Sequence, residues 1–330
     1  MIKQANNSLI SRSSTSALKI IFQVMVLFHH LVLCSTKFGE HVSAIAGPVA
    51  VGGFLLLSGY GVGLNYRKKG KAYLDKLFEI RVPHTYLILL ITNVFYLGLF
   101  YYTGGSFENV FDLIISVLYI PLFSGFEALS HYIYFLADLI IYYLLFLLFA
   151  VIFKNKKKSL LYSTLSIFAV NLLIIIVLTI INTNTGSTRY LRACVCFPLG
   201  LLFACFDSQI AEFLKKFKWF AVSMIFVIGV VVYYFCANKT INEYLVPALV
   251  GTAIILLFFG ADFKNKIINY FASLMLYVYI SHEFFRELFI YKFPSMHQNV
   301  RALIVVALSL ILAVVIERIT KLFSKKKKTA

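Results

Sequence analysis

The sequence predicts an all-α integral membrane protein, a bundle of about ten transmembrane helices with both termini in the cytoplasm. Composition is the first observation behind this prediction: 61% of the 330 residues are hydrophobic and only 14% are charged, unlike soluble globular proteins. The second is patterning. The apolar residues form runs long enough to cross about 30 Å of hydrocarbon, and short basic clusters separate these runs.

Ten apolar runs are the expected spans, and the sixth and eighth are the shortest: 17–34, 44–64, 84–102, 132–153, 159–181, 190–206, 217–237, 245–260, 267–290 and 300–322. When the connecting loops are assigned alternately to two sides, most of the 31 Lys and Arg residues fall on one side, which the positive-inside rule makes the cytoplasm. We therefore expect one membrane domain over residues 1–330. It would have a cytoplasmic N-terminal segment (1–16) and a basic cytoplasmic tail (323–330), and it would cross the cell membrane several times.

The net charge of +17 does not by itself indicate a protein that binds nucleic acid. In a soluble protein it would indicate nucleic acid, but here the basic residues lie in loops between apolar runs, so no nucleic-acid partner is expected. A cleaved signal peptide is an alternative for residues 1–34, although the polar residues and length of this run favour a retained helix. The cysteines have no metal-ligand spacing and read as packing residues, so no metal is predicted: Cys34, Cys194, Cys196, Cys205 and Cys236.

The first span carries polar residues that are expensive in hydrocarbon. Lys19, Gln23 and His30 recur at helical spacing and form one polar stripe, whereas His29 is turned about 100° away. An ionisable side chain inside a membrane is by default a hint of a working site. An imidazole, with an unperturbed pKa of about 6.5, can act as a general base. His30 is therefore the candidate catalytic residue, and His29 is interpreted as a packing or interface histidine.

A second polar cluster is expected at a similar depth. Counting from Ala17 at 1.5 Å per residue, His30 lies about 20 Å into the bilayer, and the ninth span brings Ser281, His282, Glu283 and Arg286 to about the same level. Glu283 is one candidate to orient the histidine, and Asp138 of the fourth span is the other. His282, Arg286 and Arg189 are further polar candidates for a site. As alternatives, Arg286 and Glu287 could form an outer ion pair, and Arg189 could anchor its helix at the outer headgroups.

The cytoplasmic connection between the second and third spans is strongly basic. Positive-inside bias and contact with lipid headgroups explain it most simply. It could also hold the phosphates of a nucleotide-containing cofactor. The basic residues of this connection are Arg67, Lys68, Lys69, Lys71, Lys76 and Arg81.

The second span is rich in glycine from Gly47 to Gly63. Its glycines do not repeat as a phosphate-binding fingerprint and are expected to permit close helix packing. They could also let a slender ligand arm approach the backbone, so that the helix forms one wall for an acyl-carrier tail.

These motifs resemble, in order along the whole chain, the membrane-bound acyltransferase-3 family, whose members O-acylate surface polysaccharides and lipid-linked sugars. Lys19 followed by His30 is similar to the family's basic residue, ten residues and histidine. Ser58-Gly59-Tyr60 resembles its second-helix hallmark, and Lys76 to Pro83 its basic segment before the third helix. Tyr132 to Tyr143, Phe197-Pro198-Leu199-Gly200 and Tyr277 to Glu283 also recur in kind.

The resemblance implies transfer of an acyl group, acetyl by default, from acetyl-CoA to a hydroxyl of a cell-surface polysaccharide or lipid-linked sugar. It assigns His30 as the general base, with Glu283 or Asp138 orienting it. It implies that the CoA phosphates are held by Arg67, Lys71, Lys76 or Arg81, with Ser58 and Lys19 also on the donor side. His282, Arg286 and Arg189 are the candidates for the acceptor side. The chain departs from the family in two places: Lys19 stands where arginine is usual, and only Arg81 remains of two arginines spaced three apart.

Two rival classes of function stay open at this point. A glycolipid or polysaccharide transporter or flippase would use the intramembrane histidines as a proton relay. The sequence shows neither an inverted repeat nor paired broken helices that would favour it. A scaffold subunit is the third reading, and it predicts that substitution of His30 or Arg81 has no effect on function.

Overall fold

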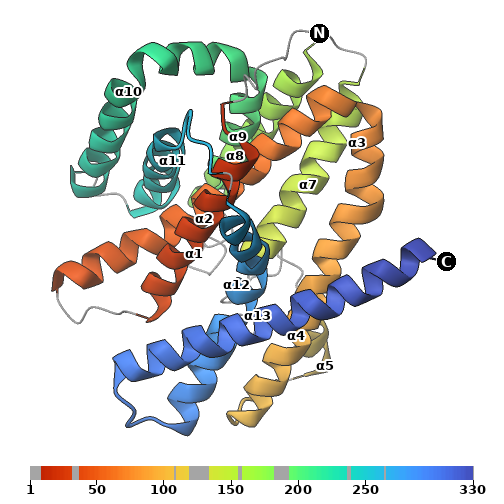
Figure 1. The fold of residues 1–330 in the computed structure, drawn as a ribbon, viewed down its shortest axis with the longest axis vertical. Coiled ribbons are helices and arrows are strands. Elements are labelled where there is room, and N and C mark those ends of the chain that lie inside the picture. Colours follow the sequence, from red (N-terminus) through yellow and green to blue (C-terminus); the bar gives the residue numbers. More distant parts are fainter. Residues whose placement is uncertain are drawn as a thin grey trace. The chain divides into compact units, whose positions relative to one another are not determined.

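The structure is a computed structural model that describes residues 9–31, 37–107, 109–118, 134–154, 158–181, 193–235, 239–263 and 265–329. Within these ranges every regular element is a helix and none is a strand (Figure 1). Each of the ten expected spans corresponds to one of these helices. The predicted all-α class is therefore confirmed.

Seven of the described helical segments are long and apolar enough to cross a membrane: Arg12–Leu31, His41–Lys69, Lys71–Tyr102, Tyr134–Ile152, Ser159–Val177, Asp207–Phe235 and Gln298–Thr320. Cys196–Cys205 and Tyr244–Leu257 are apolar but shorter. Helix α12 (Lys266–Lys292), which carries the second polar cluster, is not among the seven. The membrane class is thus supported, whereas ten crossings and the cytoplasmic placement of both termini stay predictions.

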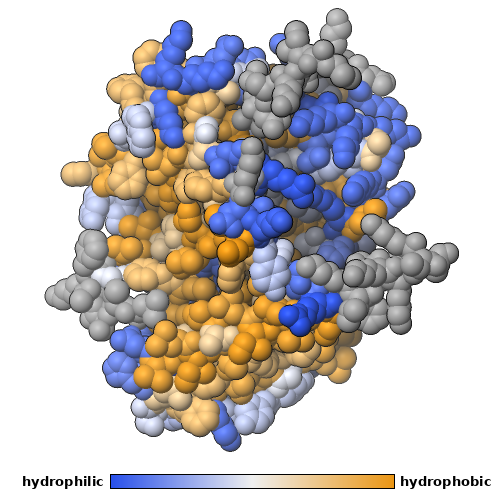
Figure 2. Space-filling view, in the orientation of Figure 1, coloured by the Kyte–Doolittle hydropathy of each residue, from blue (hydrophilic) through white to orange (hydrophobic). Residues whose placement is uncertain are grey.

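Large apolar side chains cover much of the exposed surface, as the face drawn in Figure 2 shows. Phe95, Leu173 and Val227, from three different helices, are 64%, 60% and 56% exposed. In water such extensive apolar exposure would drive aggregation, whereas in hydrocarbon it costs nothing. These faces are therefore suited to contact with lipid.

The chain forms two compact units. The first contains residues up to Ile10 together with Val51–Gly260, and the second contains Ser11–Ala50 together with Ala261–Ala330. Helix α2 (Lys37–Lys69) runs through the boundary without a break. The single-domain organisation expected from the sequence stays a prediction.

The first unit holds most of α2 and the helices in the middle of the chain. In order these are α3 (Lys71–Lys76), the π-helical turn η1 (Leu77–Arg81), α4 (Val82–Tyr102), α5 (Val110–Leu118), α7 (Tyr134–Ile152), α8 (Ser159–Ile181), α9 (Cys196–Cys205), α10 (Asp207–Phe235) and α11 (Lys239–Leu257). Helix α10 is kinked at Phe217.

Helices α2 and α9 cross at a pair of glycines. A Cβ added at Gly59 would overlap the carbonyl oxygen of Phe197, and a Cβ added at Gly200 would overlap the carbonyl oxygen of Leu56. Because neither glycine has a side chain, the two backbones can touch. Small residues allow the same close approach in other membrane helix pairs. The glycine-rich motif and the Phe197-Pro198-Leu199-Gly200 motif thus pack on each other, and the packing interpretation of the second-span glycines is confirmed at this point.

A buried carboxylate ties the start of the described chain to the same unit. Asp207 Oδ1 accepts hydrogen bonds from the backbone N–H of Leu9 at 2.9 Å and from the hydroxyl of Tyr60 at 2.6 Å. Tyr60 in turn accepts from the backbone N–H of Ile10 at 3.3 Å. The tyrosine of the Ser58-Gly59-Tyr60 motif therefore has a structural partner.

The basic connection predicted as a loop is instead mostly helical. Helix α2 continues to Lys69, Gly70 breaks the run with φ of 52°, and α3, η1 and α4 then follow without a gap. Positive φ is a conformation that glycine adopts without steric cost, which explains the single break. The prediction was wrong here because basic residues were taken to end the helices, although lysine and arginine are good helix formers.

The second unit is built from α1 (Arg12–Leu31), the first part of α2, α12 and α13 (Gln298–Thr329). Leu274 and Val278 of α12 pack against Ala313 of α13, with Ile20 of α1 alongside. At the beginning of α1, the Ser14 hydroxyl donates to the carbonyl of Ala261 at 2.6 Å. At its end, Gln298 Nε2 donates to the carbonyl of Leu31 at 3.3 Å.

Candidate functional site

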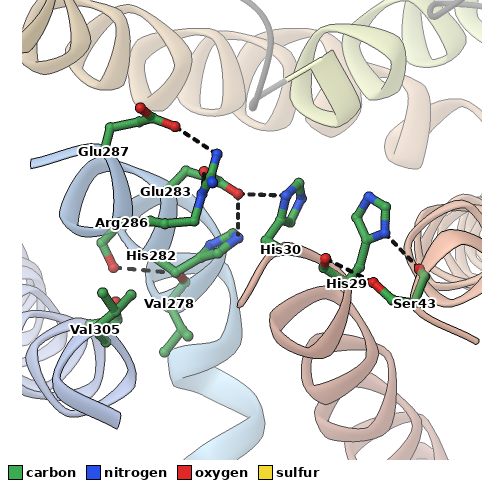
Figure 3. A network of polar contacts seen from close by, with 11 residues as sticks. His29, His30, Ser43, Val278, His282, Glu283, Arg286, Glu287 and Val305 are labelled. Atoms are coloured by element: carbon green, nitrogen blue, oxygen red, sulfur yellow. Dashed lines mark hydrogen bonds and ion pairs between the residues drawn. The ribbon is translucent and has the colours of Figure 1, made fainter. Parts of the chain in front are cut away.

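The last turn of α1 and the middle of α12 bring His30, His282 and Glu283 together in the second unit (Figure 3). His30 Nδ1 lies 2.5 Å from Glu283 Oε1, and His282 Nε2 lies 3.8 Å from the same oxygen. The His30 and His282 rings are 5.2 Å apart between centroids. The proximity predicted from depth alone is therefore present in the structure.

Helical spacing explains how both elements aim these groups inward. On α1, Gln23 and Val26 are buried, and His30 continues the same stripe. On α12, Val278, His282 and Glu283 are buried on one face. Lys19, the first member of the stripe, is exposed.

Glu283 is a fully buried carboxylate with charged neighbours. Its Oε2 accepts a hydrogen bond from Arg286 Nε at 2.6 Å, and Arg286 Nη2 donates to Glu287 Oε1 at 2.6 Å. Burial of a charge is tolerated only when it is paired. The outer ion pair expected between Arg286 and Glu287 exists, and the same guanidinium also stabilises Glu283.

His282 has a defined tautomer. Its Nδ1 lies 3.2 Å from the carbonyl oxygen of Val278, and because a carbonyl only accepts, Nδ1 must carry the hydrogen. The lone pair is then on Nε2, which is buried without a hydrogen-bond partner in the described chain. Glu283 Oε1, in contrast, is paired with His30 Nδ1.

His29 faces away from this cluster toward α2. Its Nδ1 lies 2.6 Å from the carbonyl oxygen of Ser43, and the Ser43 hydroxyl donates to the His29 carbonyl at 3.0 Å. A Cβ at Gly47 would lie 2.5 Å from the His29 ring, so glycine makes room for the imidazole. The contacts support the packing interpretation of His29.

Two of the predicted donor-binding residues meet in the first unit. The side chain of Tyr143 on α7 interacts with both Ser58 of α2 and Arg81 of η1. Arg81 Nη1 also donates to the hydroxyl of Tyr73 at 3.3 Å. Neither tyrosine was predicted from the sequence as a site residue. For Tyr143 the available signal was a phenol within an apolar run, which must find a polar partner when buried, whereas Tyr73 lies in the charged segment Lys71–Lys76.

The other predicted donor-binding residues do not join this group. Arg67 Nη1 donates to the carbonyl of Ala204 at the end of α9. Lys71 and Lys76 are exposed at the two ends of α3. They remain candidates for contact with phosphates at the surface.

The remaining candidates lie elsewhere. Asp138 is buried in α7 at 2% exposure, and its Oδ2 has no hydrogen-bond partner among the described residues. It belongs to the first unit, and its role as an orienting carboxylate stays a prediction. Arg189 lies outside the described residues.

Helices that fit a bilayer and an imidazole beside a buried carboxylate together define a membrane protein with a candidate acid–base site. The family model described as an acyltransferase domain, acyltransferase family 3, matches residues 14–318, nearly the whole chain. The chain belongs to this family. No curated protein and no solved structure matches it.

Proposed function

We propose that this membrane acyltransferase moves an acetyl group from acetyl-CoA to a hydroxyl of a cell-surface polysaccharide or lipid-linked sugar. Membership of the acyltransferase family supports the reaction class. The donor, the acceptor and a bacterial cytoplasmic membrane as the location are parts of the proposal that the family resemblance suggests.

The contact of 2.5 Å between His30 Nδ1 and Glu283 Oε1 carries the mechanistic part of the proposal. A carboxylate beside one ring nitrogen orients the imidazole and stabilises the imidazolium that forms when the other nitrogen takes a proton. Glu283 is well suited to this task because Arg286 holds its second oxygen in place. His30 is 25% exposed, so its ring is also reachable from outside the protein core.

In the proposed reaction, His30 Nε2 accepts the proton of the acceptor hydroxyl while the hydroxyl oxygen forms a bond to the thioester carbonyl carbon. The tetrahedral intermediate then expels the CoA sulfur, which takes the proton back from the His30 imidazolium. The products are the O-acetyl ester and free CoA, and His30 ends neutral. His282 and Arg286, beside the pair, are proposed to contact the acceptor, as is Arg189.

Donor binding is proposed for the basic and polar residues of the first helices. Arg67, Lys71, Lys76 and Arg81 would contact the CoA phosphates, since guanidinium and ammonium groups suit phosphate oxygens. Ser58 would lie along the pantetheine arm, and Lys19 would assist the donor. Ser58 and Arg81 both interact with Tyr143, which supports placing these two residues in one donor site.

The test compares membranes containing the wild type, His30→Asn and His29→Asn, each supplied with radiolabelled acetyl-CoA. Label should enter a glycan or lipid fraction with the wild type and His29→Asn, and incorporation by His30→Asn should fall by about 100-fold or more. Full transfer by His30→Asn would disprove the mechanism. Absence of labelled product with all three, together with loss of glycolipid transport in His30→Asn, would favour the transporter alternative.

A further inference from the structure

We propose that His30, His282 and Glu283 form a binding site for a divalent transition-metal ion, with Zn²⁺ as its best match, and that the bound ion takes His30 out of the acyl-transfer reaction. One ligand atom from each of the three residues lies within 4.8 Å of the other two. The binding part of this inference stands on geometry alone, and the inhibitory part rests on the proposed function.

A buried lone pair points to a missing partner. His282 Nε2 is fully buried and receives no hydrogen bond from any described residue, and the neighbouring Glu283 Oε1 faces both His30 and His282. Buried acceptors are normally satisfied, so an unpartnered nitrogen beside a carboxylate oxygen requires a cause. The proposed function assigns His282 only to contact with the acceptor, so without acceptor its buried Nε2 has no partner among the described residues.

The donor set is one that zinc prefers. Two imidazole nitrogens and a carboxylate are the protein ligands of one class of catalytic zinc site, in which water fills the fourth position. The hydrogen bond from His282 Nδ1–H to the Val278 carbonyl is the outer contact that metal-bound histidines make through their second nitrogen. His282 is therefore already in the tautomer that a metal requires.

The two distances to the carboxylate oxygen come close to those around a tetrahedral ion after one movement of His30, and the two histidine nitrogens lie within 4.8 Å of each other. With bonds of about 2.0–2.2 Å, neighbouring ligand atoms lie roughly 3.3–3.6 Å apart. The 3.8 Å between His282 Nε2 and Glu283 Oε1 is close to this range, whereas the 2.5 Å between His30 Nδ1 and Glu283 Oε1 is about 1 Å too short. His30 can supply the movement, because it lies in the last turn of α1 and its side chain is 25% exposed.

The surrounding charge also allows a cation. Arg286 is positive, but its guanidinium is engaged by Glu283 Oε2 and by Glu287 Oε1, each at 2.6 Å. This leaves Glu283 Oε1 directed toward His30 and His282, and it neutralises the arginine locally. The two carboxylates and the one guanidinium together carry a net charge of −1, which a bound cation can offset.

Metal binding requires the neutral His30 imidazole with its lone pair on Nδ1, so the hydrogen moves from Nδ1 to Nε2 and a nitrogen–zinc bond takes the place of the Nδ1–H bond. No proton is lost from the ring in this exchange. With a hydrogen on Nε2 and the double positive charge of the ion beside the ring, His30 cannot accept the proton of the acceptor hydroxyl. Zinc and acyl transfer therefore compete for one histidine.

The experiment uses the full-length protein, purified in detergent and freed of metal with a chelator. Co²⁺ is added as a spectroscopic probe in the absence of any acyl donor, and Zn²⁺ is then used to displace it. The expected result is one Co²⁺ per chain with visible absorption typical of four-coordinate cobalt, and loss of this absorption upon addition of one equivalent of Zn²⁺. In the acetyl-transfer assay, activity should fall in proportion to Zn²⁺ occupancy and return with the chelator.

His282→Gln is the main variant, His30→Gln is the second, and His297→Gln is the matched control at an exposed histidine after α12. Loss of even an outer contact costs 10–100-fold in metal affinity, so loss of a ligand should cost about 100-fold or more. Because His30 is partly exposed, His30→Gln keeps the test valid if His282→Gln fails to fold. The control should bind as the wild type does.

Absence of stoichiometric Co²⁺ binding, or equal affinity in both ligand variants and the wild type, would overturn the site. Stoichiometric binding with undiminished acetyl transfer would overturn the inhibitory role. Failure of the proposed function is a separate outcome: a protein that binds Co²⁺ through His30 and His282 but transfers no acetyl group retains the metal site and loses only the reaction.

Discussion

His30 Nδ1 lies 2.5 Å from Glu283 Oε1, although the two residues come from the first and the second-to-last helix of the described chain. Neither helix can form this pair by itself, because the contact exists only where α1 packs against α12. Glu283 is in turn fixed by Arg286 three residues later, so a guanidinium, a carboxylate and an imidazole form a short chain from α12 to α1.

Glu283→Gln should reduce acetyl transfer by about 100-fold or more, because an amide cannot stabilise the imidazolium that forms on His30. The matched control is Glu287→Gln, which removes the other carboxylate paired with Arg286 but leaves Glu283 in place. The measurement is kcat at saturating acetyl-CoA with membranes containing equal amounts of protein. Comparable kcat values for the two variants would show that Glu283 does not act through His30.

Arg81→Ala should raise the KM for acetyl-CoA by about tenfold, corresponding to loss of one charge-assisted hydrogen bond to a phosphate. The effect on kcat should be smaller, since Arg81 is not assigned to the reacting atoms. Lys68→Ala, at an exposed position in the same basic segment, is the control. An unchanged KM in Arg81→Ala would remove this residue from the donor site.

Gly59→Ala and Gly200→Ala should each destabilise the protein by about 1–3 kcal/mol, because the added methyl group meets a backbone carbonyl of the opposite helix. Gly61→Ala is the matched control in the same helix, since nothing lies within 4 Å of its Cβ position. That variant should be neutral or stabilised by up to about 1 kcal/mol through better helix propensity. Thermal unfolding in detergent, followed by circular dichroism, measures the difference. Similar melting temperatures for Gly59→Ala and Gly61→Ala would contradict the close crossing.

Asp207→Ala should cost about 1–3 kcal/mol or more, because two buried donors, Leu9 N–H and the Tyr60 hydroxyl, lose their acceptor. Tyr60→Phe should cost less, since the carboxylate keeps the Leu9 hydrogen bond. Limited proteolysis should then cut near residue 9 faster in Asp207→Ala than in the exposed control Ser208→Ala. Equal cleavage rates would mean that Asp207 does not anchor this segment.

The helices were predictable because a segment that crosses hydrocarbon needs a long apolar run. Helix α8 (Ser159–Ile181), for example, consists mostly of apolar residues. The site was partly predictable for the same reason. His30 and Glu283 are costly in an apolar segment, so depth counting was enough to expect them at one level.

The remaining features of the fold and the site depend on tertiary contacts, which the spacing of residue types along the chain does not predict. The reciprocal glycines of α2 and α9, the Asp207 anchor and the Tyr143 contacts join residues far apart in the sequence. The helical course of residues 71–81 was missed because charge was read as a sign of a loop, although the backbone there satisfies its own hydrogen bonds. His282 was placed correctly, but its tautomer required the Val278 carbonyl to be located.

The last turn of α1 carries His30, so its stability should determine how long His30 stays beside Glu283. His30 lies one residue before the helix stops, and terminal turns are the first parts of a helix to fray. The hydrogen bond from Gln298 of α13 to the Leu31 carbonyl should therefore help to hold His30 in place, from a helix that carries none of the proposed site residues. Amide hydrogen exchange at the last turn of α1 would then report the lifetime of the assembled His30–Glu283 pair.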